Sequence, residues 1–353
     1  MMTRRELLKA AGSAAVLMAP LQAEPTVPNP NGKLGLGAAP TGFMARMRAN
    51  RAAHPPVDWI DYCHGLGLGG VETSAPPKDP SEIARLRDKL ESYNMHVIFN
   101  VRLPKTEADV AAFEEGVKAA REAGAYGLHA ALTPRRYEQF DSFEAFKASF
   151  EQNQRTVALA EPVLRRNKIR LAIENHKGWR SAEQATWLKR LGSEYVGVHL
   201  DFGNNVSLCE DPMQTLDTLL PYVFSGHLKD MAVAPYEDGF LLSEVVLGEG
   251  FLDLESMVHK LRQKDPNMVL DLETITRDPL KIPVFTNKYW VTFDDSYSPL
   301  PGRDLARTLE TVKKNPPKKP LPHVTGLSPA EQLKNEDENN LACILYARRN
   351  LGL

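Results

Sequence analysis

Short apolar segments alternate with longer amphipathic segments along most of this 353-residue chain. The short segments have the length of buried β-strands and lie at 33–39, 68–74, 96–103, 124–132, 169–176, 196–204, 223–230 and 268–274. The longer segments have the spacing of helices and lie at 80–93, 106–123, 142–166, 181–191, 211–220 and 253–264. Strands that alternate with helices in this way form a parallel sheet.

Eight strands that alternate with helices are the number that closes into a (β/α)₈ TIM barrel, so we expect an α/β protein with this fold. An open, doubly wound sheet is the alternative. The glycine-rich stretch 65–70 does not support a dinucleotide site in such a sheet, because it precedes a strand instead of linking a strand to a helix. We expect one barrel domain over 33–290. An irregular C-terminal extension over 291–353 is expected to pack on it, with helices at 303–314 and 328–350.

The N-terminus has the pattern of an export signal. Arg4 and Arg5 precede a small and apolar run, and Ala23 is the expected cleavage site. We therefore expect a twin-arginine signal peptide over 1–23, a linker over 24–32 and a periplasmic or exported protein. A first amphipathic helix of the fold is the alternative. The apolar run is too short for a stable membrane span.

The net charge, cysteine spacing and hydrophobic content limit which classes of partner and site are expected. A net charge of −2 argues against nucleic acid, whose phosphates require a basic surface. Cys63, Cys209 and Cys343 have no paired spacing, so neither a disulfide framework nor a cysteine-zinc site is expected. Hydrophobic residues make up 42% of the chain, which is enough for a sizeable core. A homo-oligomer remains compatible with the sequence.

Charged and imidazole side chains gather at the ends of the last four predicted strands. Residues two apart share a strand face, and four such pairs occur. They are Glu174 with His176, His199 with Asp201, His227 with Lys229, and Asp271 with Glu273. The residues on the other face are apolar and suit packing against helices: Ile173, Leu200, Leu228 and Leu272. Active sites of such barrels lie at the C-terminal ends of the strands, so a site is expected there.

Several buried carboxylates cannot all stay ionised at close range without a cation. Any one of these charged residues alone could be a capped strand end or part of a surface salt bridge. Four of them at equivalent positions on consecutive strands instead favour a site for one divalent metal. The expected ligands are Glu174, Asp201, His227 and Glu273. This mostly hard ligand set favours Mn²⁺, with Mg²⁺, Co²⁺ or Zn²⁺ as alternatives.

Five segments carry a family resemblance: LAIENH, VGVHLDFGN, SGHLKD, LGEGFLD and LDLET. They resemble the xylose-isomerase-like TIM barrel superfamily, which includes the sugar phosphate isomerase/epimerase family and the AP endonuclease family 2 type, over about residues 33–290. The resemblance implies one metal on Glu174, Asp201, His227 and Glu273. It also implies that Glu174 and Glu273 act as an acid/base pair on a carbohydrate.

These features predict a sugar or keto-sugar isomerase or epimerase. The reaction would abstract a proton next to a carbonyl and pass through a metal-stabilised enediolate. A lyase or dehydratase acting on a keto-sugar or inosose begins with the same step and is the second hypothesis. A non-catalytic sugar-binding barrel is the third, although the presence of both Glu174 and Glu273 argues against it.

Four further residues are candidates for substrate binding: Lys229, His176, Glu72 and Asn204. For Lys229 the alternative is an ion pair with Asp201 or Glu273. Asn204 stands where ketose 3-epimerases have a histidine, which argues against their usual sugar. The endonuclease branch binds three metals with more histidines than are found here, so a phosphodiesterase is not expected.

Overall fold

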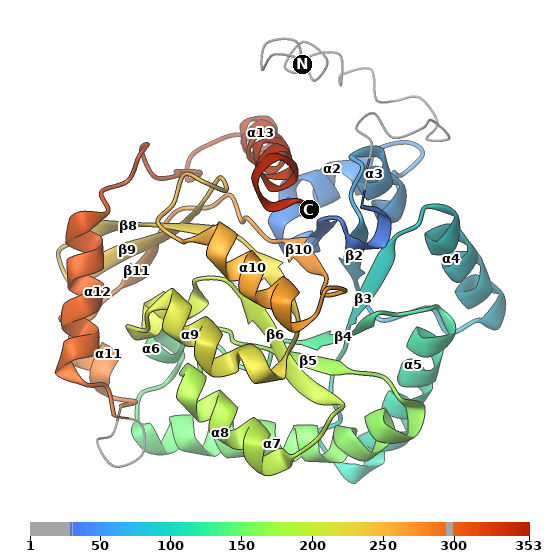
Figure 1. Cartoon of the computed structure of the whole chain (residues 1–353), viewed down its shortest axis with the longest axis horizontal. Coiled ribbons are helices and arrows are strands. Elements are labelled where there is room, and N and C mark those ends of the chain that lie inside the picture. The colour runs from blue at the N-terminus through green and yellow to red at the C-terminus, as the bar shows by residue number, and fades with distance from the viewer. Residues whose placement is uncertain (1–28, 30, 294–298) are drawn as a thin grey trace.

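The computed structural model describes residues 29, 31–293 and 299–353. The predicted TIM barrel is present, with eight parallel strands in the closed order β1-β10-β7-β6-β5-β4-β3-β2 (Figure 1). The strands are β1 (Gly37–Ala38), β2 (Gly70–Thr73), β3 (His96–Asn100), β4 (Gly127–Ala130), β5 (Leu171–Glu174), β6 (Val196–Asp201), β7 (Val223–Leu228) and β10 (Leu270–Leu272). Because Gly37 pairs with both Gly70 and Asp271, no edge remains open, and the doubly wound alternative is excluded.

Helices surround the barrel and cover its outer face (Figure 1). The six predicted helices are present as α4 (Pro80–Ser92), α5 (Val110–Glu122), α7 (Phe143–Asn167), α8 (Ser181–Leu191), α9 (Pro212–Leu219) and α10 (Leu254–Lys264). Asp79, Ser142, Asp211 and Asp253 each accept backbone N–H bonds at the start of their helices. Such N-caps satisfy donors that the first helical turn leaves unpaired, so these boundaries were readable from the sequence.

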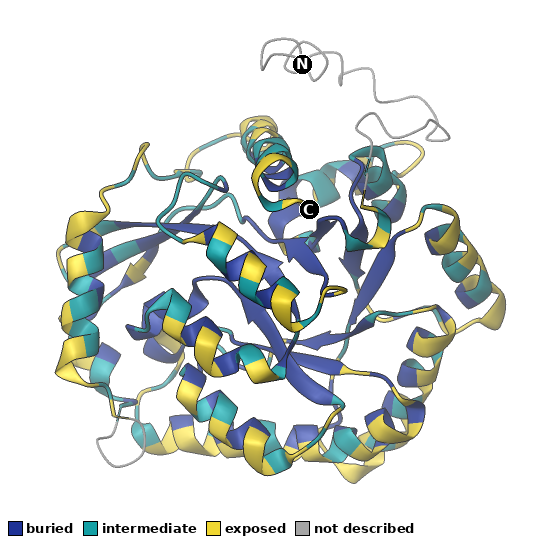
Figure 2. Cartoon of the chain, in the orientation of Figure 1, coloured by how far each residue is buried: buried dark blue, intermediate teal, exposed yellow. Residues whose placement is uncertain are grey.

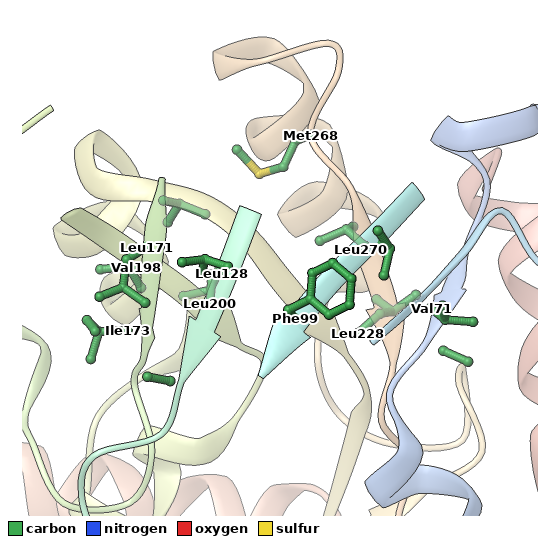
Figure 3. Close-up of a cluster of buried hydrophobic side chains, with 14 of the residues drawn as sticks. Val71, Phe99, Leu128, Leu171, Ile173, Val198, Leu200, Leu228, Met268 and Leu270 are labelled. Carbon is green, nitrogen blue, oxygen red and sulfur yellow. The ribbon is translucent and has the colours of Figure 1, made fainter. Parts of the chain in front are cut away.

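The barrel strands are buried on both faces, whereas the outer helices expose one side (Figure 2). Ile173, Leu200 and Leu228 are at most 1% exposed and belong to the apolar core shown in Figure 3. Their burial confirms that the apolar face of each strand packs toward the helices. The alternate face is therefore left to point into the barrel.

A small antiparallel sheet interrupts the regular alternation after β7. It consists of β8 (Asp230–Tyr236), β9 (Gly239–Val245) and β11 (Leu280–Ile282), in the order β11-β9-β8. The expected alternation of strands and helices does not include this sheet. Pro235 fits in β8 because this strand lies at the edge of the sheet, where a missing N–H is tolerated.

Asp230 organises the loop that follows this hairpin. Its carboxylate accepts the backbone N–H groups of Gly248 and Gly250 at 2.9 Å and that of Leu252 at 3.2 Å. It also accepts the N–H of Met231, and the side chain is 1% exposed. One buried carboxylate thus fixes the turn that returns the chain to α10.

Asp230→Ala is expected to lower the free energy of unfolding by about 2–4 kcal/mol, because it leaves buried N–H groups without an acceptor. Asp230→Asn keeps one acceptor oxygen and should cost less. Urea unfolding followed by circular dichroism measures both losses. An alanine variant as stable as the wild type would show that water replaces the carboxylate.

The helices of the C-terminal segment pack at separate places around the barrel. They are α11 (Asn287–Trp290), α12 (Gly302–Lys314) and α13 (Pro329–Tyr346), followed by a π-helical turn at Ala347–Leu351. Helix α12 packs on β8, and α11 packs on α6 (Arg136–Gln139). Helix α13 lies on α2 (Met44–Ala52), where Glu336 accepts the N–H groups of Ala45 and Arg46 (Figure 1). The short α3 (Trp59–Gly65) and α6 complete the α-helices that the structure describes.

The signal peptide predicted over 1–23 and most of the predicted linker lie outside the described residues. Within the described part of the chain, every helix is too short or too polar to cross a membrane.

Candidate metal and substrate site

The four predicted metal ligands come from four neighbouring strands of the barrel. Glu174 ends β5, Asp201 ends β6, His227 lies near the end of β7, and Glu273 follows β10 directly. Ligand atoms of Glu174, Asp201 and His227 all lie within 4.8 Å of one another. Glu273 Oε2 is 3.4 Å from His227 Nδ1. The structure therefore brings all four side chains together at the C-terminal mouth, where they are nearly inaccessible to solvent.

Asp201 Oδ1 and His227 Nδ1 make no hydrogen bond of good geometry among the described residues. Both are buried, and their nearest charged neighbours are Lys229 Nζ at 2.7 Å from the first and Glu273 Oε2 at 3.4 Å from the second. Each is a good ligand for a divalent cation, and carboxylate oxygens with one imidazole suit Mn²⁺, Mg²⁺, Co²⁺ or Zn²⁺. The donor set thus fits the predicted metal.

Lys229 forms the ion pairs that the sequence raised as its alternative role. Its Nζ donates to Glu273 Oε2 at 2.8 Å and lies 2.7 Å from Asp201 Oδ1, although the second contact lacks hydrogen-bond geometry. Burial lowers the pKa of Lys229, but the surrounding carboxylates outweigh it and hold the pKa well above its usual value. Burial raises the pKa of Glu273, but Lys229 and His227 hold it well below its usual value. Both groups are therefore charged at neutral pH.

Glu244 joins this ion-pair group from the unexpected hairpin. Its Oε1 lies 3.6 Å from Lys229 Nζ and accepts a bond from Arg277 at 2.8 Å. Its Oε2 accepts the N–H of Ile275. The sequence analysis missed Glu244, because nothing within residues 239–245 indicates that the β8–β9 hairpin folds back over the mouth.

A layer of imidazoles lies against the carboxylate of Glu72. Glu72 Oε1 is 2.9 Å from His227 Nε2 and 3.6 Å from His199 Nε2, and Oε2 is 3.7 Å from His129 Nδ1. His129 was not singled out from the sequence, yet its Nε2 lies 3.3 Å from Glu174 Oε2. The alternation of side chains along β4 places His129 on the inner face of the barrel, so this residue could have been predicted from the sequence.

The contact between Glu72 and His227 orients the imidazole. Because the carboxylate only accepts, Nε2 carries the proton and Nδ1 turns toward Asp201 and Glu273. Carboxylates that hold a metal-binding histidine in this way set its tautomer. Glu72 is 2% exposed, and its observed contacts are with imidazoles. Its predicted role in substrate binding stays a prediction.

Glu72→Gln is expected to weaken metal binding by about 10–100-fold, the usual effect of removing such a partner. The amide oxygen can still accept a hydrogen bond from His227 Nε2, but the substitution removes the negative charge that favours the required tautomer. Titration calorimetry with Mn²⁺ measures the affinity. Unchanged affinity would show that the His227 tautomer is fixed by other groups.

Asn204 connects two of the predicted ligands. Its Nδ2 donates to Glu174 Oε1 at 3.2 Å and to Asp201 Oδ2, while its Oδ1 accepts a bond from Lys177 Nζ. The sequence analysis did not consider Lys177, which lies just beyond β5. His176 turns its Nδ1 to the carbonyl oxygen of Thr133 at 2.6 Å.

The family model of the xylose isomerase-like TIM barrel matches residues 60–290, which is well over half of the chain. The chain belongs to this family. The predicted superfamily is thereby confirmed, and the observed closed barrel is its fold.

Similar proteins show how far the likeness extends. The uncharacterized protein YihM of Escherichia coli K12 is 22% identical over 227 residues, 62% of this chain and 65% of YihM. A 3-oxo-isoapionate decarboxylase of Pectobacterium atrosepticum is 28% identical over 109 residues, 30% of this chain and 40% of that protein. The chain thus spans less than two thirds of each curated relative.

Among solved structures, a D-psicose 3-epimerase determined in the presence of D-fructose superposes with a TM-score of 0.54. The identity is 16%, and the match covers 84% of this chain and 93% of the epimerase, which shows a shared fold.

Proposed function

We propose that the protein is a metal-dependent isomerase or epimerase of a sugar or keto-sugar. The observation that carries this proposal is the placement of two carboxylates, Glu174 on β5 and Glu273 after β10. The strands β6 and β7 lie between them in the barrel and supply Asp201 and His227. A substrate that lies over the centre would therefore have a carboxyl group on each side.

Both glutamates are held in place by other side chains. Glu273 Oε1 accepts from Thr41 Oγ1 at 2.5 Å, and Lys229 holds Oε2. Asn204 holds Glu174 Oε1, and His129 lies beside its Oε2. Such fixed positions suit proton transfer, which requires the acceptor within hydrogen-bond reach of the reacting carbon.

Glu174, Asp201, His227 and Glu273 would hold the divalent cation, which supplies Lewis-acid polarisation of the substrate carbonyl when bound. Burial raises the pKa of Glu174, but the His129 contact and the charge of His176 outweigh it and keep the pKa low. Glu174 is therefore ionised and able to accept the proton next to that carbonyl. Glu273, which is ionised at rest, would first take up a proton from water or from a substrate hydroxyl. Delivery of that proton to the opposite face would invert the carbon, and delivery to the neighbouring carbon would isomerise the sugar.

A lyase is the second candidate, supported by the similarity to a decarboxylase. Elimination of water from a keto-sugar or inosose starts with the same proton removal, so the same residues would serve. A sugar-binding barrel without turnover is the third candidate. A protein that only binds a sugar does not need two glutamates held in positions suited to proton transfer.

Incubation of Mn²⁺-loaded protein with aldoses, ketoses and 3-keto glycosides in deuterated water tests the proposal. We expect solvent deuterium next to the carbonyl of at least one recovered sugar, and its loss in Glu174→Gln and in Glu273→Gln. A product lighter by one water would indicate the lyase. Sugar binding without exchange in the whole panel would contradict both enzymatic hypotheses.

A further inference from the structure

Lys177 is a buried cation without an adjacent counter-charge. Its side chain is 3% exposed, and its Nζ donates to the neutral Oδ1 of Asn204. No carboxylate oxygen of residues 29, 31–293 and 299–353 lies within 4.0 Å of this ammonium group. Lys229, in contrast, has Asp201 and Glu273 beside it.

A buried ammonium group is normally paired, because removing it from water costs several kcal/mol. Burial, followed by repulsion from Lys229, lowers the pKa of Lys177 to about 8. Among the described residues, Asp201 and Glu244 attract this ammonium group only from a distance, and burial with the repulsion from Lys229 outweighs them. A partner that arrives with the substrate would remove this imbalance.

The position of Lys177 links it to the reacting centre. The amide of Asn204 that accepts from Lys177 also donates to Glu174 and Asp201. The ammonium group is thus one side-chain amide away from two predicted metal ligands. An anionic group on a substrate bound at the centre would lie near this ammonium group.

We propose that Lys177 binds a carboxylate of the substrate, so that the site acts on sugar acids that contain a ketone. This inference rests on the proposed function, since it names the substrate class of the same site. A single ammonium group matches the single charge of a carboxylate, whereas a phosphate dianion calls for several donors. The Asn204 amide holds the lysine in place and, unlike a histidine, adds no further positive charge.

Matched pairs that differ by one oxidised carbon test the proposal. They are L-sorbose with 5-keto-D-gluconate, D-fructose with D-fructuronate, and D-tagatose with D-tagaturonate, and D-fructose 6-phosphate serves as a phosphate arm. Each is titrated calorimetrically into Mn²⁺-loaded protein and incubated with it in deuterated water. At least one acid should bind about 10–100-fold more tightly than its neutral partner, the usual gain from a charged hydrogen bond.

Lys177→Met should erase this preference by lowering the affinity for the acid much more than the affinity for its neutral partner, and Lys177→Arg should keep part of it. Lys189→Met, at an exposed lysine of α8, is the matched control and should retain the full preference. Circular dichroism confirms that each variant is folded.

Equal binding and exchange of acid and neutral partners would overturn the inference and leave the proposed function standing. A Lys177-dependent preference for acids without deuterium exchange would support the inference and contradict the proposed function. Tighter binding of the phosphate, or no binding of any acid, would overturn the inference.

Discussion

Glu174→Gln and, separately, His227→Ala are expected to release most of the metal from the purified protein, which should contain about one divalent ion per chain. Ligand atoms of both residues lie within 4.8 Å of those of Asp201. Even the loss of a residue that only supports a ligand lowers metal affinity by about 10–100-fold, so the loss of a ligand should cost roughly 100-fold or more. Elemental analysis of dialysed protein measures the metal content.

Matched controls separate ligation from a general effect of each substitution. Glu255→Gln and His259→Ala make the same changes at exposed positions of α10 and should retain the metal. Circular dichroism of all four proteins shows whether the fold survives. Metal content at the wild-type level in both site variants would mean that these side chains are not the ligands.

The period-two spacing of the strands was enough to place the predicted ligands. Once Glu174, Asp201 and His227 were assigned to the inner face of consecutive parallel strands, their meeting at one end of a barrel followed from geometry. The helices were also readable, because caps such as Asp79 and Ser142 mark their starts locally. These features depend on residues close together in the sequence.

The missed residues depend on contacts between distant segments. Glu244 reaches Lys229 only because the β8–β9 hairpin folds back over the mouth, and no local pattern encodes that return. Lys177 lies beyond the end of β5, where the alternation no longer assigns a face. Its burial follows from its contact with Asn204, 27 residues later in the chain. Alternation thus predicts the inner face of strands, but not the loops that close over them.

Lys229→Met is expected to destabilise the metal-free protein by about 3–5 kcal/mol, the usual cost of removing one partner from a buried ion pair. The substitution keeps most of the apolar stem but leaves Asp201 and Glu273 facing each other without their shared cation. Urea unfolding in the presence of a chelator measures this loss. Lys260→Met is the matched control, because Lys260 pairs with Asp217 at the surface and its loss should cost about 0–1 kcal/mol.

The same variant distinguishes charge compensation from packing. If Lys229 stabilises the mouth by neutralising carboxylates, saturating Mn²⁺ should restore part of the lost stability, since a divalent ion supplies the missing positive charge and binding to the folded state alone raises its stability. If the lysine contributes mainly through its packed stem, Mn²⁺ should stabilise wild type and variant equally. A metal-free loss no larger than that of Lys260→Met would show that Asp201 and Glu273 do not depend on Lys229. In that case the Lys229 ammonium group and the metal ion would not both neutralise the carboxylates of Asp201 and Glu273.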